Sequence, residues 1–226
     1  MIVSRVMTKN PVLIHPDMSI NEIRSLMDKA QIGHLPVMSK NNELVGLMTR
    51  KDLVKATPTM ATSLDMYEIS YLLSKITAKD VMEKKVLTVD ENEVVEEAAR
   101  IMADNAIGCL PVTRGELIVG IITDTDLFHV FLNAFGARHP GLRITLNIQE
   151  KPGQLARLAQ VIAEKGGNVV AFVTSEWEDL SRRRATIKVA GISREDAEKI
   201  LKNFDDMEVE DIRYRFRFGL EYFFFT

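Results

Sequence analysis

Two short stretches of the chain carry residues that could bind an anion and a sugar. Gly46–Leu53 reads GLMTRKDL, and Gly120–Leu127 reads GIITDTDL. In each stretch, an apolar run typical of a strand ends at a threonine, and an aspartate three residues later lies in a pattern that can open a helix. Unpaired amides at a helix N-terminus suit a phosphate, and an aspartate carboxylate can accept hydrogen bonds from ribose hydroxyls. A nucleotide would suit both groups.

The same spacing has an explanation that needs no ligand. Thr49 with Asp52, and Thr123 with Asp126, match the capping-box pattern that begins many helices. For one copy alone, capping is the preferred interpretation. The repeat that surrounds both copies shifts the balance toward binding.

The composition fits a globular chain of one to three domains, since 226 residues with 46% hydrophobic content can bury real cores. A net charge of -3, from 29 basic and 32 acidic residues, disfavours general binding to nucleic acid or to an anionic membrane. The single cysteine, Cys109, excludes an intramolecular disulfide and fits a reducing compartment. No apolar run approaches the roughly 20 residues that span a bilayer, and the first residues lack a signal peptide's apolar core. We therefore expect a cytoplasmic protein.

An internal repeat organises the first 130 or so residues. Val6–Met7 recurs as Val81–Met82, and Ile32–Val37 recurs as Ile107–Val112, both at an offset of 75 (81 − 6). From Gly46 onward the offset is 74 (120 − 46), so one residue is missing from the polar turn that holds Asn41 and Asn42 in copy one. A deletion in a turn leaves the flanking elements intact.

The residue pattern of each copy predicts a small βαββα unit. In copy one, Ser19 and Glu22 form a capping box before apolar residues at helical spacing, which predicts a helix over residues 20–30. Two apolar runs, 35–38 and 44–48, flank the turn as in a hairpin, and a second helix follows Thr49. One copy of about 50 residues is too small to be stable alone, so we expect the two copies to pair.

The repeated I-G-x-L-P-V and G-x-x-T-x-x-D-L signatures resemble the CBS domain, and the tandem pair resembles a Bateman module. The resemblance implies a cleft that binds an adenine nucleotide (AMP, ADP or ATP) or an adenosyl ligand such as S-adenosylmethionine. It implies that threonine lies near phosphate or ribose, that aspartate binds ribose, and that backbone at the start of the hairpin borders the base. The residues concerned are Thr49, Arg50, Lys51, Asp52, His34, Leu35 and Pro36 in copy one, and Thr123, Asp124, Asp126, Cys109, Leu110 and Pro111 in copy two.

The two copies differ in charge at this motif. Copy one places Arg50 and Lys51 between threonine and aspartate, and copy two places Asp124 and Thr125 there. Two cations favour a phosphorylated ligand, whereas an added carboxylate repels phosphate. Our hypothesis is that the first site takes the more highly phosphorylated ligand and that the second takes a less anionic adenosyl species or stays empty. The alternative is that these charges are only solvated residues at a helix start.

After a Gly- and Pro-containing link, the pattern changes near Leu142 to strand, helix, strand, strand, helix, strand, which is a ferredoxin-like order. The K-P-G-Q-L turn followed by E-K-G-G-N-V resembles the ACT domain. That family often binds amino acids between adjoining copies, which implies a ligand site at Pro152, Gly153, Gln154, Leu155 and Asn168. A domain that only dimerises is the open alternative.

The fold class expected is therefore α+β, with a pair of βαββα CBS repeats before a βαββαβ ACT domain. The expected domains are 1–57 (first CBS domain), 58–77 (helical linker), 78–135 (second CBS domain), 142–217 (ACT domain) and 218–226 (apolar tail). Thr62 and Asp65 can cap the linker helix. The linker string ATSLDMYEISYLLSKI, between two CBS motifs, resembles the acetoin-utilization protein B (AcuB) family.

We find no pattern typical of a catalytic or metal site. The four histidines show no metal-ligand spacing with Cys109 or with one another, and there is no nucleophile elbow, Walker loop or dinucleotide fingerprint. The sequence predicts a non-catalytic homodimeric regulator that senses an adenosyl ligand, acts on another protein, and belongs by resemblance to acetoin or acetate metabolism. The alternative is an interaction scaffold that binds no ligand.

Overall fold

The computed structural model describes residues 1–56, 71, 75–176, 179 and 181–215, in two compact units, Met1–Leu127 and Phe128–Thr226. Most of the expected linker helix, including its cap at Thr62 and Asp65, and the apolar tail lie outside the described residues. Each unit is described by itself.

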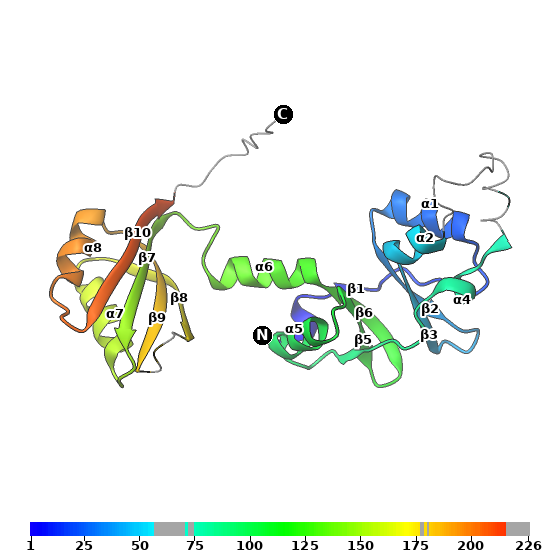
Figure 1. Ribbon diagram of the computed structural model, residues 1–226, viewed down its shortest axis with the longest axis horizontal. Coiled ribbons are helices and arrows are strands. Elements are labelled where there is room, and N and C mark those ends of the chain that lie inside the picture. The colour runs from blue at the N-terminus through cyan, green and yellow to red at the C-terminus, as the bar shows by residue number, and fades with distance from the viewer. Residues whose placement is uncertain (57–70, 72–74, 177–178, 180, 216–226) are drawn as a thin grey trace, which may run out of the picture. The chain divides into compact units, whose positions relative to one another are not determined.

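The first unit contains the two repeats (Figure 1). Copy one has a short 3-10 helix η1 (Val3–Arg5), β1 (Thr8–Lys9), α1 (Ile20–Ala30), β2 (His34–Met38), β3 (Leu44–Thr49) and α2 (Arg50–Ala56). Copy two has α4 (Ala78–Val81), β4 (Val89–Asp90), α5 (Val95–Asp104), β5 (Cys109–Arg114), β6 (Leu117–Thr123) and α6 (Asp124–Ala134), which continues into the second unit. In both copies the hairpin strands pair antiparallel.

Helix α1 begins where the sequence predicts. The Ser19 hydroxyl accepts a hydrogen bond from the Glu22 amide, and the Glu22 carboxylate accepts one from the Ser19 amide at 2.9 Å. This capping box satisfies amides that the first helical turn leaves unpaired. On the apolar face of the helix, Ile20, Ile23 and Met27 are fully buried in one core with residues of β2 and β3, and Leu26 is partly buried against that core.

The leading segment of each copy packs into the other copy. Strand β1 pairs with β6 of copy two, and Val3 is fully buried in the core of copy two. In return, Ala78 is buried in the core of copy one, and Leu47 and Glu83 exchange two backbone hydrogen bonds of 2.9 and 3.0 Å. The two sequence repeats are therefore not two separate packing units.

Glycines in β3 and β6 allow this exchange. A Cβ added to Gly46 would lie 2.3 Å from the sulfur of Met82, and one added to Gly120 would lie 2.3 Å from the sulfur of Met7. A glycine inside a strand often marks such a close approach of another chain segment. The repeated Val-Met pair and the repeated glycine are thus the two sides of one contact.

The second unit is a four-stranded antiparallel sheet in the order β10-β7-β9-β8 (Figure 1). Its elements are β7 (Gly141–Gln149), α7 (Gln154–Glu164), β8 (Asn168–Glu176), β9 (Arg182–Ala190), α8 (Arg194–Leu201) and β10 (Met207–Arg215). Alternate apolar residues of β7 and β9 pack against α7 and α8 in one core. The order is that of a ferredoxin-like fold, so the predicted α+β fold class is confirmed.

The last strand is longer than its sequence pattern predicts, since the alternation of apolar and basic residues that indicates a strand begins at Ile212 and continues through Tyr214. Strand β10 begins five residues earlier, at Met207, and the register shifts between Val209 and Asp211. The bulge allows Met207 and Ile212, an odd number of residues apart, both to contact the core. Tyr214, expected on the apolar face, is 51% exposed.

We predict that Gly120→Ala lowers the free energy of unfolding of the first unit by about 1–3 kcal/mol, since the added methyl meets Met7 and, at 3.0 Å, the Thr8 carbonyl oxygen. Urea denaturation and hydrogen exchange at the Asn10 amide, which donates to Val119 O, would measure it. Met7→Ala should restore part of the loss. Gly33→Ala is the control, because its nearest non-neighbour atom lies 3.9 Å away; equal effects of both substitutions would contradict the packing argument.

Candidate functional site

The two Thr/Asp pairs have the same geometry. Asp52 Oδ2 accepts hydrogen bonds from the Thr49 amide and hydroxyl at 2.9 and 2.7 Å. Asp126 Oδ2 accepts from the Thr123 amide and hydroxyl, both at 2.8 Å. Both pairs therefore cap a helix, as the ligand-free interpretation requires. The second oxygen of Asp52, Oδ1, takes no part in this cap and lies 3.7 Å from Lys55 Nζ.

The backbone amides at these junctions are also paired. The Thr49 amide donates to Asp52, and the Arg50 amide donates to the Gly33 carbonyl at 3.1 Å. In copy two, the Asp124 amide donates to the Gly108 carbonyl at 3.0 Å. A phosphate at this place would therefore be held by side chains and not by these amides.

A cavity of about 630 Å³ lies between the copies of the first unit. It brings together seven of the residues expected at the nucleotide site: His34, Thr49, Arg50, Lys51, Asp52, Cys109 and Asp124. It is not lined by Leu35, Pro36, Leu110, Pro111, Thr123 or Asp126. The first four are buried in the hairpin strands, and Leu35 and Leu110 are fully buried in the cores.

Sequence reasoning missed much of the cavity wall. Lys55 follows Lys51 by one helical turn of α2, so the spacing could have identified it. The others come from two places with no local signal in the sequence, the segment after α4 and the end of α5. They are Glu83, Lys85, Val86, Leu87, Asn105, Ala106, Ile107 and Gly108, with Gly33 and Leu47 from copy one.

Arg50 has a structural partner outside the cavity. Its guanidinium binds the Asp28 carboxylate at 2.8 Å and the Met27 carbonyl at 3.1 Å. It therefore ties α2 to the end of α1. The cations that line the cavity besides Arg50 are Lys51, Lys55 and Lys85.

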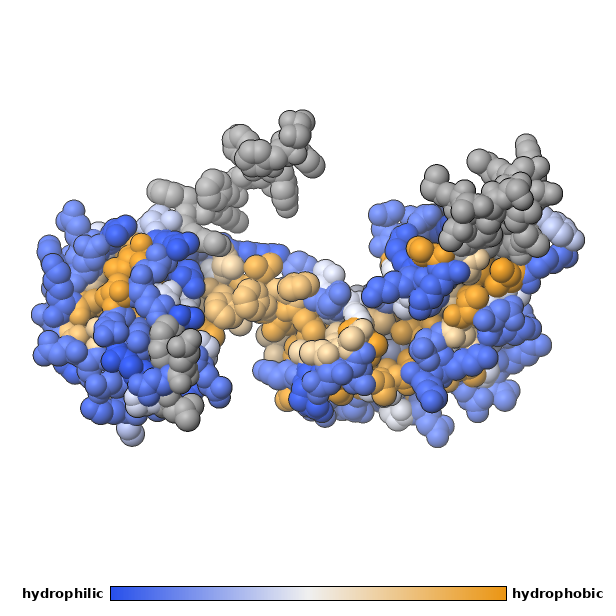
Figure 2. Space-filling view, viewed as in Figure 1, coloured by the Kyte–Doolittle hydropathy of each residue, from blue (hydrophilic) through white to orange (hydrophobic). Residues whose placement is uncertain are grey.

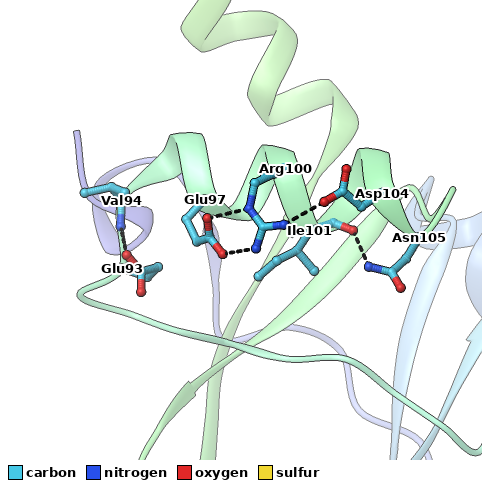
Figure 3. Close-up of polar contacts among 7 residues, drawn as sticks. All are labelled: Glu93, Val94, Glu97, Arg100, Ile101, Asp104 and Asn105. Carbon is cyan, nitrogen blue, oxygen red and sulfur yellow. Dashed lines mark hydrogen bonds and ion pairs between the residues drawn. The ribbon is translucent and has the colours of Figure 1, made fainter.

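The residues that follow α5 form one edge of the cavity. Within α5, Arg100 binds Glu97 and Asp104, and the Asn105 amide group donates to the Ile101 carbonyl at 2.8 Å (Figure 3). The next residue, Ala106, has a left-handed backbone with φ of 52°. This conformation is costly for alanine, so the surrounding structure must hold the turn that places Ile107 in the wall.

Burial is the main cause of the pKa shifts of two groups that line the cavity, His34 and Cys109. Burial lowers the pKa of His34, the charge of Lys51 lowers it further, and the charge of Asp124 raises it in part. Burial, helped by Asp124, raises the pKa of Cys109 to about 12. The thiol therefore stays protonated and unreactive near neutral pH.

In the second unit, a cavity of about 400 Å³ lies at the start of α7. It is lined by the expected residues Pro152, Gly153, Gln154 and Leu155, whereas Asn168 does not line it. Gln149 also lines it, and its buried Oε1 has no hydrogen-bond partner among the described residues. Figure 2 shows that hydrophilic residues cover most of the visible face of this unit.

The described residues contain neither a candidate metal site nor a candidate membrane-spanning helix. No group of three or more His, Cys, Asp and Glu side chains could hold a metal ion in this part of the chain. None of the described helices is both long and apolar enough to cross a membrane.

Family models match both parts of the chain. A CBS-domain model matches residues 3–58 and 78–133, and a TTHA0829-like ACT-domain model matches residues 140–213. The chain therefore belongs to the CBS-domain family. More particularly, it is a CBS domain pair followed by an ACT domain, as the sequence predicted.

Relatives match the CBS pair. L-aspartate semialdehyde sulfurtransferase from Methanocaldococcus jannaschii is 29% identical over 131 residues, which are 58% of this chain and 23% of that enzyme. The AcuB protein of Vibrio cholerae is 30% identical with a TM-score of 0.49, covering 59% of this chain and 91% of that one. A CBS pair solved with 5′-methylthioadenosine and S-adenosyl-L-methionine is 29% identical with a TM-score of 0.49, covering 58% and 95%.

We predict that stability falls as the pH drops below about 6.5, because the unfolded state then binds a proton at His34 that the folded state resists. The stabilisation is complete above the ordinary histidine pKa and is lost toward the lowered folded value. Urea denaturation at about pH 7.5 and about pH 5.5 would measure it. His34→Gln should lose less stability over this interval than the unsubstituted chain; an unchanged loss would refute the prediction.

Proposed function

We propose that the chain is a non-catalytic regulator that senses an adenine nucleotide or a related adenosyl ligand in the cavity of its CBS pair. One observation carries the proposal. Two Thr/Asp caps have the same geometry, yet the copy-one cap lines a ligand-sized cavity and Thr123 and Asp126 do not line it. A cap needs no cavity, so the position of Asp52 calls for a further role.

The chemistry of the wall fits an adenosyl ligand. Ligand cavities of about 300–1,000 Å³ combine apolar walls with a few placed polar groups. Here Leu47, Val86, Leu87 and Ile107 offer apolar surface for a base. Asp52 Oδ1, which the cap does not use, can accept hydrogen bonds from ribose hydroxyls, and the lysines can meet phosphate.

The ligand would act by population shift. The cavity wall comes from both copies, so a bound ligand favours the arrangement of copies that it contacts best. In this proposal the chain is a cytoplasmic homodimer whose state is read by another protein. From the resemblance of the linker sequence to the AcuB family, we propose that this partner belongs to acetoin or acetate metabolism. A scaffold that binds no ligand is the competing proposal.

Isothermal titration with AMP, ADP, ATP, S-adenosylmethionine and 5′-methylthioadenosine tests the proposal. We expect at least one to bind, and Asp52→Ala to weaken it at least about tenfold, the equivalent of about 1.4 kcal/mol. Asp126→Ala is a matched control, because it removes the same kind of cap, worth about 0.5–2 kcal/mol of stability, outside the cavity. The absence of binding would leave the scaffold. Equal weakening by both variants would refute the role of Asp52 in the cavity.

We also propose that the ACT domain takes a small amino acid at the start of α7. Gly153, at the N-cap, has no side chain to cap the 11-residue helix, so the amides of its first turn can meet a carboxylate. Gln149 Oε1, without a partner among the described residues, can accept from an ammonium group.

A thermal-shift screen of amino acids checks this second site. We expect one or more to stabilise the protein, and Gln149→Leu to abolish the shift by removing the acceptor. Gln160→Leu is the control, since Gln160 is exposed on the same helix and binds Glu164. If no amino acid stabilises the protein, the domain is left with dimerisation alone.

A further inference from the structure

We infer that three lysines make the cavity of the CBS pair selective for nucleosides that carry two or more phosphates, and that Lys85 is a specificity-determining residue. The inference rests on the proposed function and adds a ligand class to it. The sequence-based hypothesis assigned phosphate binding to the helix amides and to Arg50 with Lys51. Here the phosphates are bound by Lys51, Lys55 and Lys85 instead of by the helix amides or Arg50.

Two kinds of group that the sequence suggested for phosphate, the amides at the start of α2 and the Arg50 guanidinium, already form hydrogen bonds within the fold. The amides of Thr49 and Arg50 have partners within the fold, and the Arg50 guanidinium is held by Asp28 and the Met27 carbonyl. Freeing any of them would break a contact that holds copy one together. A phosphate chain therefore meets the flexible cations of the wall first.

Those cations come from two elements. Lys51 and Lys55 are four residues apart on α2, so both project from the same face of the helix, and both line the cavity. Lys85 lies on the segment that copy two sends into copy one, just after the backbone bridge between Leu47 and Glu83. The Lys85 amide donates to the Glu83 carboxylate at 2.8 Å, which fixes the turn that presents it.

Three acids line the cavity, and two of them lie on the lysine side. Asp52 is 9% exposed, with one oxygen in its cap and the other beside Lys55, and the Glu83 carboxylate accepts from the Lys85 amide. Asp124 lies at the opposite copy, next to Gly108, and repels phosphate there. Three lysines against two carboxylates leave the lysine side positive, so it attracts a ligand more with each phosphate charge, whereas an uncharged adenosyl group gains none.

The symmetry-related positions of the pair lack these lysines. At the repeat offsets, Lys85 of copy two corresponds to Asn10 of copy one (85 − 75), and Lys51 and Lys55 of copy one correspond to Thr125 and His129 of copy two (51 + 74 and 55 + 74). The cluster therefore has no counterpart at the other end of the repeat relationship. The repeat pattern that both copies share does not require it.

Titration calorimetry on the full chain, with adenosine, AMP, ADP and ATP at low and at physiological salt, tests the inference. ATP should bind at least about tenfold more tightly than adenosine, and the difference should shrink as salt rises. Lys85→Gln should weaken ATP about tenfold, as expected for one lost charge-assisted contact, and leave adenosine unchanged. Lys84→Gln is the matched control, because Lys84 is the exposed neighbour that does not line the cavity.

The outcomes separate the two proposals. If adenosine binds as tightly as ATP and Asp52→Ala abolishes both, the sensor stands and the selectivity is overturned. If Lys84→Gln weakens ATP as much as Lys85→Gln does, the attraction is diffuse and the selectivity is again overturned. If no adenosyl compound binds, the proposed function fails and the inference fails with it. Inorganic tripolyphosphate, added to the ATP titration, should compete with ATP for the unsubstituted chain more strongly than for Lys85→Gln; equal competition would overturn the role of Lys85.

Discussion

The first unit depends on one contact made twice, a methionine of one copy lying against a strand glycine of the other. Met7 meets Gly120 and Met82 meets Gly46, each at a distance that no Cβ would permit. The contact lets β1 join β6 and lets the segment after α4 cross to β3. That crossing carries Glu83 and Lys85 to the cavity, so the cavity wall depends on the same packing that joins the copies.

In the proposed function, Asp52 contributes both to the stability of α2 and to ligand binding. One of its oxygens caps α2 and the other lies beside Lys55 at the cavity. A substitution there changes both properties, and only comparison with Asp126, which has the cap without the cavity, separates them. A capping box and a ribose-binding aspartate are therefore compatible uses of one carboxylate, because they need different oxygens.

Local patterns predicted the elements well. Ser19 and Glu22 marked the start of α1, and two apolar runs around a turn marked β2 and β3, because these signals depend on neighbours in the chain. Seven of the expected residues line the cavity: the Thr-Arg-Lys-Asp motif of copy one, His34, Cys109 and Asp124. Lys85 and Ile107 could not be found this way, because their places depend on the exchange between copies and on a left-handed alanine at 106. The bulge in β10 had no residue signature either.

The exchange of leading segments also affects the order in which the chain can fold during synthesis. Thr8 and Lys9 leave the ribosome well before β6, the strand they pair with, which follows the whole of copy one. Copy one needs only the chain up to Glu83 to close its hairpin bridge, whereas copy two must recover a segment made long before. Such a non-local pairing is slow, and its partners stay exposed in the meantime. The packing of Met7 against Gly120 is therefore a late step in the folding of the nascent protein.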